Sequence, residues 1–243
     1  MIGISKIDVP YRYPSGDSLT APPSASDGGK AQPDPRRPRP RIETLADLIF
    51  GLSLSIGSLA LLTSAPSDLV EINNHILAFI FTFLILITAW MIYTTYMSVL
   101  PVETRAVTFL NIVLLLMVAL IPYLLNSVEV PNMAATDPAG IQDYSSQLFA
   151  LDLAGILLIL AAFAHVLSIE ENNLVPSETV RLFKNGRNRM TILAALMAVT
   201  IAPQFWEVII DGVHLRLYLW YVPLISYWVG RALRPETRTY RLV

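Results

Sequence analysis

The sequence predicts an all-α, polytopic membrane protein with six transmembrane helices per subunit and both termini in the cytoplasm. Three observations favour this fold: the composition, six apolar runs, and the alternation of basic loops. Of the 243 residues, 54% are hydrophobic and 15% are charged, whereas soluble domains carry about 25% charged residues. The chain contains no cysteine, so neither a disulfide nor a Cys-ligated metal is expected.

Residues 1–40 differ from the rest of the chain because they are rich in proline and poor in apolar clusters. Such a segment cannot bury a core, so a disordered cytoplasmic arm is predicted. Its basic end consists of Arg36, Arg37, Arg39 and Arg41. These arginines are predicted to fix the orientation of the first span; the alternative is binding of anionic lipid head groups, at about 1 kcal/mol per basic residue.

The first apolar run, Arg41–Leu62, begins the predicted transmembrane domain, residues 41–233, and sorts its residues by helical face. Leu52, Ile56 and Leu59 recur at i, i+4 and i+7 and therefore form one apolar stripe on a helix. Small residues at the same spacing beside the stripe allow neighbouring helices to approach closely in lipid. The helix is expected to pack on more than one side; simple lipid contact or helix packing is the alternative for the stripe.

Five more apolar runs complete the predicted domain. Their bounds are Asn73–Met97, Arg105–Leu125, Tyr144–Ile169, Met190–Ile209 and Leu215–Leu233. Pro203 predicts a break in the fifth span, because proline lacks the N–H of the helical ladder. The basic residues 234–243 form a predicted cytoplasmic tail.

The basic residues define the orientation of the six spans. Of the 17 Lys and Arg residues, only Arg216 falls in a loop assigned to the outer side, as expected when basic loops stay in the cytoplasm. The outer loops instead contain acidic residues: Asp68, Glu71, Glu129, Asp137, Asp143, Glu207 and Asp211. If these acids ring an entrance they concentrate cations there; otherwise they are ordinary solvated loop residues.

Asp47 lies inside the first apolar run, where an ionised carboxylate is costly unless it is paired. The predicted topology brings Trp90, Tyr93 and Asn111 to a similar depth on the next two helices. Their polar atoms, or the guanidinium of Arg41, are candidate hydrogen-bond donors to the carboxylate. The cluster predicts a structural network that joins three helices, and a catalytic acid is the less favoured interpretation.

These residues resemble a known family. The pattern Arg41-x-x-x-Leu45-Ala46-Asp47 is similar to the Arg-x-x-x-Phe-Ser-Asp signature of the endo-lysosomal potassium channels (transmembrane protein 175) and their prokaryotic six-helix relatives. The likeness covers the first three spans and includes Trp90, Asn111 and Ile121-Pro122-Tyr123.

The resemblance implies a homotetrameric, potassium-permeable channel with a central pore lined by the first helix. The apolar layers that form gate and filter in the family align with Leu52, Ile56 and Leu59, and a hydroxyl layer aligns with Ser55. The permeant ion is then potassium, with membrane lipid, monovalent cations and further copies of the chain as partners. The implied location is the prokaryotic cell membrane.

The sequence departs from the family at two places. Leu45-Ala46 replaces Phe-Ser, which removes a hydroxyl beside the acid. Tyr93-Thr94 replaces a pair of histidines, which removes a pH-responsive element. Asp152 and His165 lie within the fourth span, where they are candidates for a functional site or for hydrogen bonds between helices.

No motif for an enzyme, a cofactor, a metal or a nucleic acid stands out in the sequence, and none of these is expected. A secondary transporter is the alternative to a channel, but it is expected to show inverted repeats and broken helices in matching halves. A non-conducting scaffold subunit is the third hypothesis. The favoured interpretation is a cation channel with an apolar gate.

Overall fold

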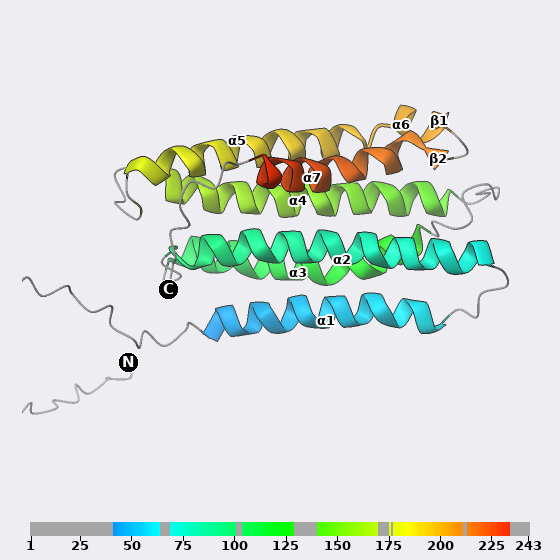
Figure 1. The fold of residues 1–243 in the computed structure, drawn as a ribbon, viewed down its shortest axis with the longest axis horizontal. Helices are drawn as coiled ribbons and strands as arrows, with labels where there is room; N and C mark the ends of the chain where they lie inside the picture. The colour runs from blue at the N-terminus through cyan, green and yellow to red at the C-terminus, as the bar shows by residue number, and fades with distance from the viewer. Residues whose placement is uncertain are drawn as a thin grey trace, which may run out of the picture. The chain divides into compact units, whose positions relative to one another are not determined.

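Seven helices and a short β-hairpin form the described part of the chain in the computed structural model (Figure 1). The described residues are 41–63, 69–100, 104–128, 140–169, 175, 177–210 and 213–233. The elements are α1 (Arg41–Thr63), α2 (Leu69–Met97), α3 (Arg105–Ser127), α4 (Ile141–Ser168), α5 (Ser177–Val199), α6 (Gln204–Glu207), β1 (Ile209–Ile210), β2 (Val213–His214) and α7 (Leu215–Ala232). All belong to one compact unit, Arg39–Val243.

Several predictions concern residues outside this description. The structure does not describe the arm 1–40 or the tail 234–243. It also does not describe four of the outer acids: Asp68, Glu129, Asp137 and Asp211. Arg41 and Glu71 are in helices, but their side chains are not among those described.

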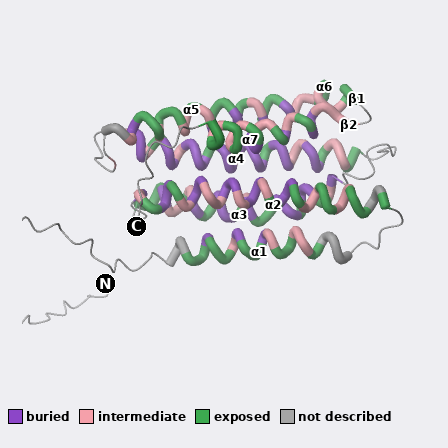
Figure 2. Tube along the Cα trace, in the orientation of Figure 1, coloured by how far each residue is buried: buried purple, intermediate pink, exposed green. Residues whose placement is uncertain are grey.

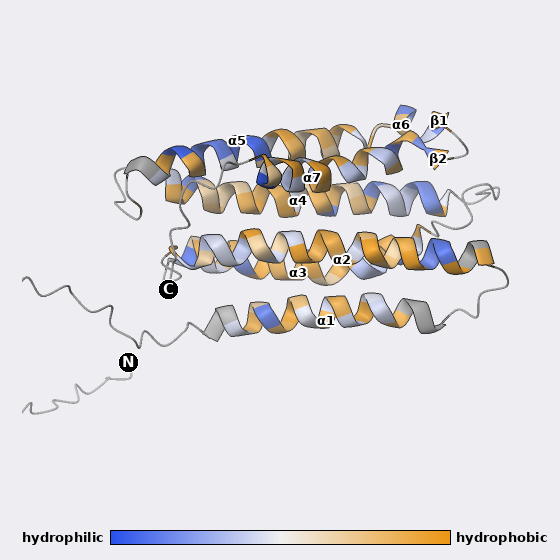
Figure 3. Cartoon of the chain, in the orientation of Figure 1, coloured by the Kyte–Doolittle hydropathy of each residue, from blue (hydrophilic) through white to orange (hydrophobic). Residues whose placement is uncertain are grey.

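The predicted bounds of the fifth span were wrong. Helix α5 begins at Ser177 rather than Met190 and ends at Val199, before Pro203. Figure 3 shows blue, hydrophilic residues interspersed in its first half, and hydropathy alone therefore does not reveal this half as part of the helix. Phe183 in this half packs against Tyr96 of α2, with ring centroids 5.8 Å apart. Packing on other helices extends α5 beyond its apolar stretch.

A β-hairpin with two residues in each strand is present in an otherwise helical fold. After the turn at Pro203 and the short helix α6, Ile209 pairs with His214 and Ile210 with Val213 in antiparallel register. The His214 ring stacks on Trp206 with centroids 3.7 Å apart. The reversal leads directly into α7, so a few residues turn the chain back towards the membrane-spanning part.

Three described helices are long and apolar enough to cross a membrane: Ile72–Met97, Arg105–Ser127 and Ile141–Ser168. A bilayer core of about 30 Å requires about 20 apolar residues in a helix. The apolar part of α1, Thr44–Leu59, is shorter, and the count of six spans remains a prediction.

Helix α4 is central to the packing. It lies against α5 and α3 over long stretches and also contacts α2 and α7. One of its contacts pairs Phe149 with Trp220 of α7, with ring centroids 4.3 Å apart. Helix α1 packs mainly on α2 and α3, and exposed positions coloured green in Figure 2 run along its length. One face of the first helix is therefore left uncovered by the subunit's own core.

Candidate pore helix and the polar contacts around it

Helix α1 presents two faces of different character. Ala46, Phe50 and Ser53 are buried, with exposed fractions of 0%, 2% and 1%. The other face is apolar and exposed by 45% to 66%; it consists of Leu45, Leu48, Leu52, Ile56 and Leu59. We call these five residues the exposed stripe. The three residues predicted as apolar layers thus lie together on the surface of the subunit.

Ser55 is exposed on the same helix as the stripe. Its hydroxyl donates to the carbonyl of Gly51 at 3.0 Å, which uses its one proton and leaves oxygen lone pairs free to accept. Leu54, by contrast, is half-buried and packs against the core. Neighbouring positions on α1 therefore face different surroundings. On the exposed side of the helix, Ser55 presents an acceptor oxygen and no free N–H or O–H donor.

Asp47 is bound to the second helix by a direct hydrogen bond. The indole Nε1 of Trp90 donates to Oδ1 of Asp47 at 2.9 Å. Asp47 itself is exposed, although the position inside an apolar run is one where a charge needs a partner. Of the donors considered from the sequence, Trp90 is therefore one that reaches the carboxylate.

Tyr93 and Asn111 lie in the core behind this bond. Tyr93 is 1% exposed, and its ring centroid is 5.8 Å from that of Phe50 on α1. Asn111 is fully buried, but neither its amide nitrogen nor its amide oxygen has a hydrogen-bond partner among the described residues. The hydrogen bond from Asn111 to Asp47 that the sequence allows is therefore not formed among the described residues.

A second polar centre surrounds Arg216 at the start of α7. Its guanidinium is fully buried and binds Asp143 Oδ1 at 2.5 Å and Ser146 Oγ at 2.6 Å, both on α4. It also donates to main-chain carbonyls just beyond the end of α5: to Thr200 at 2.7 Å, and to Ile201 and Ala202 at 3.2 Å each. One side chain therefore ties together the ends of three helices.

In this centre the positive charge of Arg216 is matched by acceptors that carry negative or partial negative charge. The carbonyls near the end of a helix carry partial negative charge and lack intrahelical donors, so a cation there is favourable. The guanidinium also lies 5.4 Å from the ring of Trp206. A buried cation with this many acceptors avoids the large penalty of an unpaired charge in the membrane.

The pattern of basic residues predicts Arg216 in an outer loop and assigns it no role. The position of Arg216 as a lone basic residue among acidic loops could have indicated a buried ion pair, because such a residue requires a partner. The structure also corrects the set of outer acids: Asp143 forms an ion pair with Arg216 and is not a free carboxylate at an entrance. Glu207, on α6, is exposed.

The two titratable candidates on α4 lie in different settings. Asp152 is 5% exposed, and its Oδ2 has no hydrogen-bond partner among the described residues. His165 is exposed near the other end of the helix, and its Nδ1 lies 3.2 Å from Nη1 of Arg187 on α5. The structure does not bring the two together, since more than three helical turns separate them.

The fold and these contacts define an α-helical membrane protein whose first helix exposes an apolar stripe. Residues 41–122 match the family model described as the endosomal/lysosomal potassium channel TMEM175. The match spans α1, α2 and α3 up to Pro122, and it confirms the family resemblance found in the sequence for this stretch. No curated protein matches the chain.

Structural comparison extends the likeness beyond the third helix. The chain is similar to the crystal structure of a lysosomal potassium-selective channel TMEM175 homolog from Chamaesiphon minutus, with a TM-score of 0.56 and 16% sequence identity. The alignment covers 80% of this chain and 97% of that one. At this identity the comparison establishes a shared fold.

Proposed function

We propose that this chain is the subunit of a potassium-permeable cation channel in the prokaryotic cell membrane, with α1 lining the pore. The observation that carries the proposal is the exposed stripe, because it lies on an edge helix within the stretch that matches the channel family. The solved relative is described as a homolog of a lysosomal potassium-selective channel, which supports potassium as the permeant ion. Both termini lie in the cytoplasm, as the distribution of basic residues indicates.

The exposed stripe favours assembly into a ring. A single helix cannot enclose a path for ions, whereas copies related by a closed rotation bring the same face of α1 to a common axis. A homotetramer is the assembly that the family resemblance implies. In such a ring the stripe of each copy faces those of the others, and its apolar surface is covered without any change in the subunit core.

The spacing of the stripe supports a gate made of apolar layers. Leu52 and Ile56 lie about 6 Å apart along a helix axis, and Leu59 lies about 4.5 Å further. Narrow apolar rings of this kind close a pore by expelling water. The Ser55 oxygen lies between the first two layers, where it offers a cation an acceptor in place of lost hydration.

Flux through purified protein in liposomes tests the proposal directly. Potassium, sodium and proton gradients are applied separately, and the mass of the complex is measured in mild detergent. A channel gives potassium flux that does not require a second coupled ion, in a complex four times the subunit mass. Flux that requires a coupled gradient would indicate a secondary transporter, and a complex without flux would indicate a scaffold. Monomers with intact flux would exclude the tetrameric pore.

A further inference from the structure

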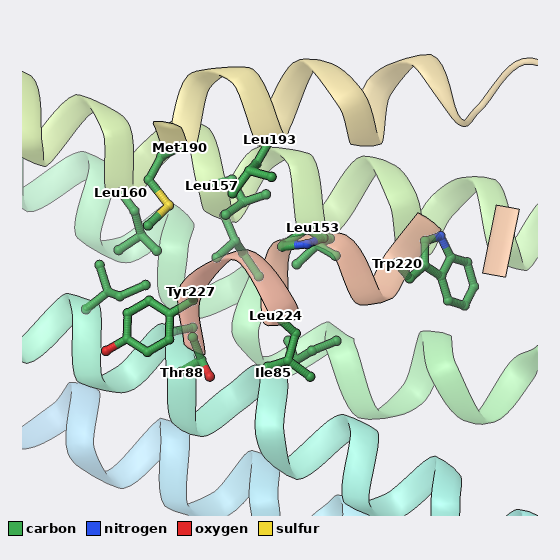
Figure 4. Close-up of a pocket in the computed structure, with 14 residues that line it drawn as sticks. Ile85, Thr88, Leu153, Leu157, Leu160, Met190, Leu193, Trp220, Leu224 and Tyr227 are labelled. Atoms are coloured by element: carbon green, nitrogen blue, oxygen red, sulfur yellow. The ribbon is translucent and has the colours of Figure 1, made fainter. Parts of the chain in front are cut away.

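A second site lies away from α1, in a cavity lined by α2, α4, α5 and α7 and open on one side (Figure 4). The space measures about 470 Å³, including its open side. Its wall is almost entirely apolar, and representative residues from the four helices are Ile85, Leu157, Leu193 and Leu224. Trp220 and Tyr227 lie towards opposite ends of the lining in Figure 4. Because this volume includes the open side, the space is a groove between the helices and not a closed chamber.

Two polar groups in this wall have no partner. Thr88 is 8% exposed and Trp220 is 2% exposed, and neither the Thr88 hydroxyl nor the Trp220 Nε1 makes a hydrogen bond to any described residue. Buried polar atoms are nearly always paired, because leaving one unsatisfied costs free energy. Both side chains line the cavity, so a molecule inside it is a source of the missing partner.

Threonines elsewhere on α2 show that the state of Thr88 is specific to its position. Thr82 donates to the carbonyl of Ala78 at 2.9 Å, and Thr94 donates to that of Trp90 at 3.0 Å. This bond to the preceding turn is the usual arrangement for a helical threonine. Thr88 does not make it, and its hydroxyl therefore remains available beside the cavity.

The surroundings of the cavity determine what can enter it. The lining segments of α2 and α4 belong to two helices that are long and apolar enough to cross a membrane, so the adjacent medium is lipid. A charged ligand would be costly at this depth, whereas alkyl chains match the wall. Trp220 Nε1 can only donate, and the Thr88 hydroxyl can donate or accept.

We propose that this cavity binds an uncharged alkyl amphiphile with a single oxygen, drawn from the bilayer. The alkyl chain lies against the apolar wall, and the oxygen accepts a hydrogen bond from the Trp220 indole or the Thr88 hydroxyl. Ion conduction plays no part in this binding, so the site is tested without measuring flux.

The test uses the full chain in lipid nanodiscs, a photoreactive diazirine derivative of a long-chain alkanol, and peptide mapping of the labelled residues. Label is expected on the cavity-lining parts of α2, α4 or α7. n-Decanol should compete about fivefold better than n-decane at equal mole fraction in the membrane, which is the factor expected from one hydrogen bond. Equal competition by the two compounds, or label confined to lipid-facing residues, would overturn the proposal.

Two variants remove the polar atoms: Thr88→Val keeps the shape of the side chain, whereas Trp220→Phe keeps an aromatic ring but is smaller than the indole. Trp220→Phe and Thr88→Val together should bring n-decanol down to the competition shown by n-decane. Trp228→Phe, at an exposed tryptophan, is the matched control and should keep the preference. A preference that survives the loss of both polar groups would contradict the assigned recognition.

A third variant fills the cavity. Leu157→Trp projects a large ring into it and should abolish the label, whereas Leu158→Trp, on an exposed face of α4, should not. Persistent label in a folded Leu157→Trp protein would place the ligand elsewhere. If Leu157→Trp fails to fold, the two polar variants decide, since neither Thr88→Val nor Trp220→Phe breaks a hydrogen bond to a described residue.

Discussion

Trp90 on α2 holds the carboxylate of Asp47 on α1 by a hydrogen bond of 2.9 Å. The bond links the helix with the exposed stripe to its neighbour in the subunit. Asp47 lies on the exposed side of α1, next to Ala46, which is fully buried. The contact therefore lies at the edge of the packed interface, where it adds a polar link between α1 and α2.

Removing this bond should weaken folding and assembly more than it alters ion selectivity. Asp47→Ala and Trp90→Phe should each lower stability by about 0.6 to 2 kcal/mol, the range for polar contacts between membrane helices. Because both remove the same bond, the double variant should cost less than the sum of the two. Thermal unfolding in detergent measures this, with Trp228→Phe as control. An Asp47→Ala protein that assembles normally but conducts sodium as well as potassium would place Asp47 in the ion path.

Leu52→Asn should raise the resting cation flux. An amide holds water where a branched alkyl group repels it, so the substitution hydrates an apolar constriction. Leu54→Asn is the matched control, because Leu54 packs against the core instead of belonging to the exposed stripe. It should lower stability and leave the pore closed. Flux in the Leu52 variant at or below wild type, at equal protein amount in liposomes, would exclude a gate at this residue.

Arg216→Met should strongly destabilise the protein. The substitution removes the cationic partner of the Asp143 carboxylate and the donors to the carbonyls beyond α5. Loss of one partner from a fully buried ion pair costs about 3–5 kcal/mol, and the cost here should lie towards the lower end because Asp143 is 29% exposed. Adding Asp143→Asn should recover part of this loss, because it removes the stranded charge. Denaturant unfolding in detergent checks the order, with the exposed Arg231→Met as control; equal effects of Arg216→Met and Arg231→Met would contradict it.

Gly155→Val should disturb the packing of α3 on α4. A Cβ atom at this glycine would lie 2.1 Å from Cε and 2.9 Å from Sδ of Met117, so the methionine must move. Overpacking costs about 1–3 kcal/mol, and the lower end is expected here because the two overlapping atoms are at the end of the flexible Met117 side chain. In a Met117→Ala background the same substitution should cost clearly less, which separates steric overlap from other effects of losing the glycine. Ala119→Val, at an exposed position of α3, is the control in thermal unfolding.

The sequence by itself determined where most helices lie, because a bilayer makes length and hydropathy decisive. The helices α1 to α4 and α7 fall within a few residues of the predicted runs. It also pointed to the first helix and to Asp47 and Trp90, since an acid inside an apolar run requires a donor. The apolar residues Leu52, Ile56 and Leu59 could be assigned to one face from their spacing alone.

Only the tertiary structure decided which partners these residues meet. The polar half of α5 is helical because it packs on other helices, and hydropathy carries no record of that contact. Trp90, and not Asn111, bonds to Asp47, because the rotation of each helix depends on packing against all its neighbours. Arg216 is buried rather than solvated, since the hairpin and the start of α7 return it to the acceptors of α4 and α5. Long-range contacts of this kind are set by the assembled helices and not by the local pattern of residues.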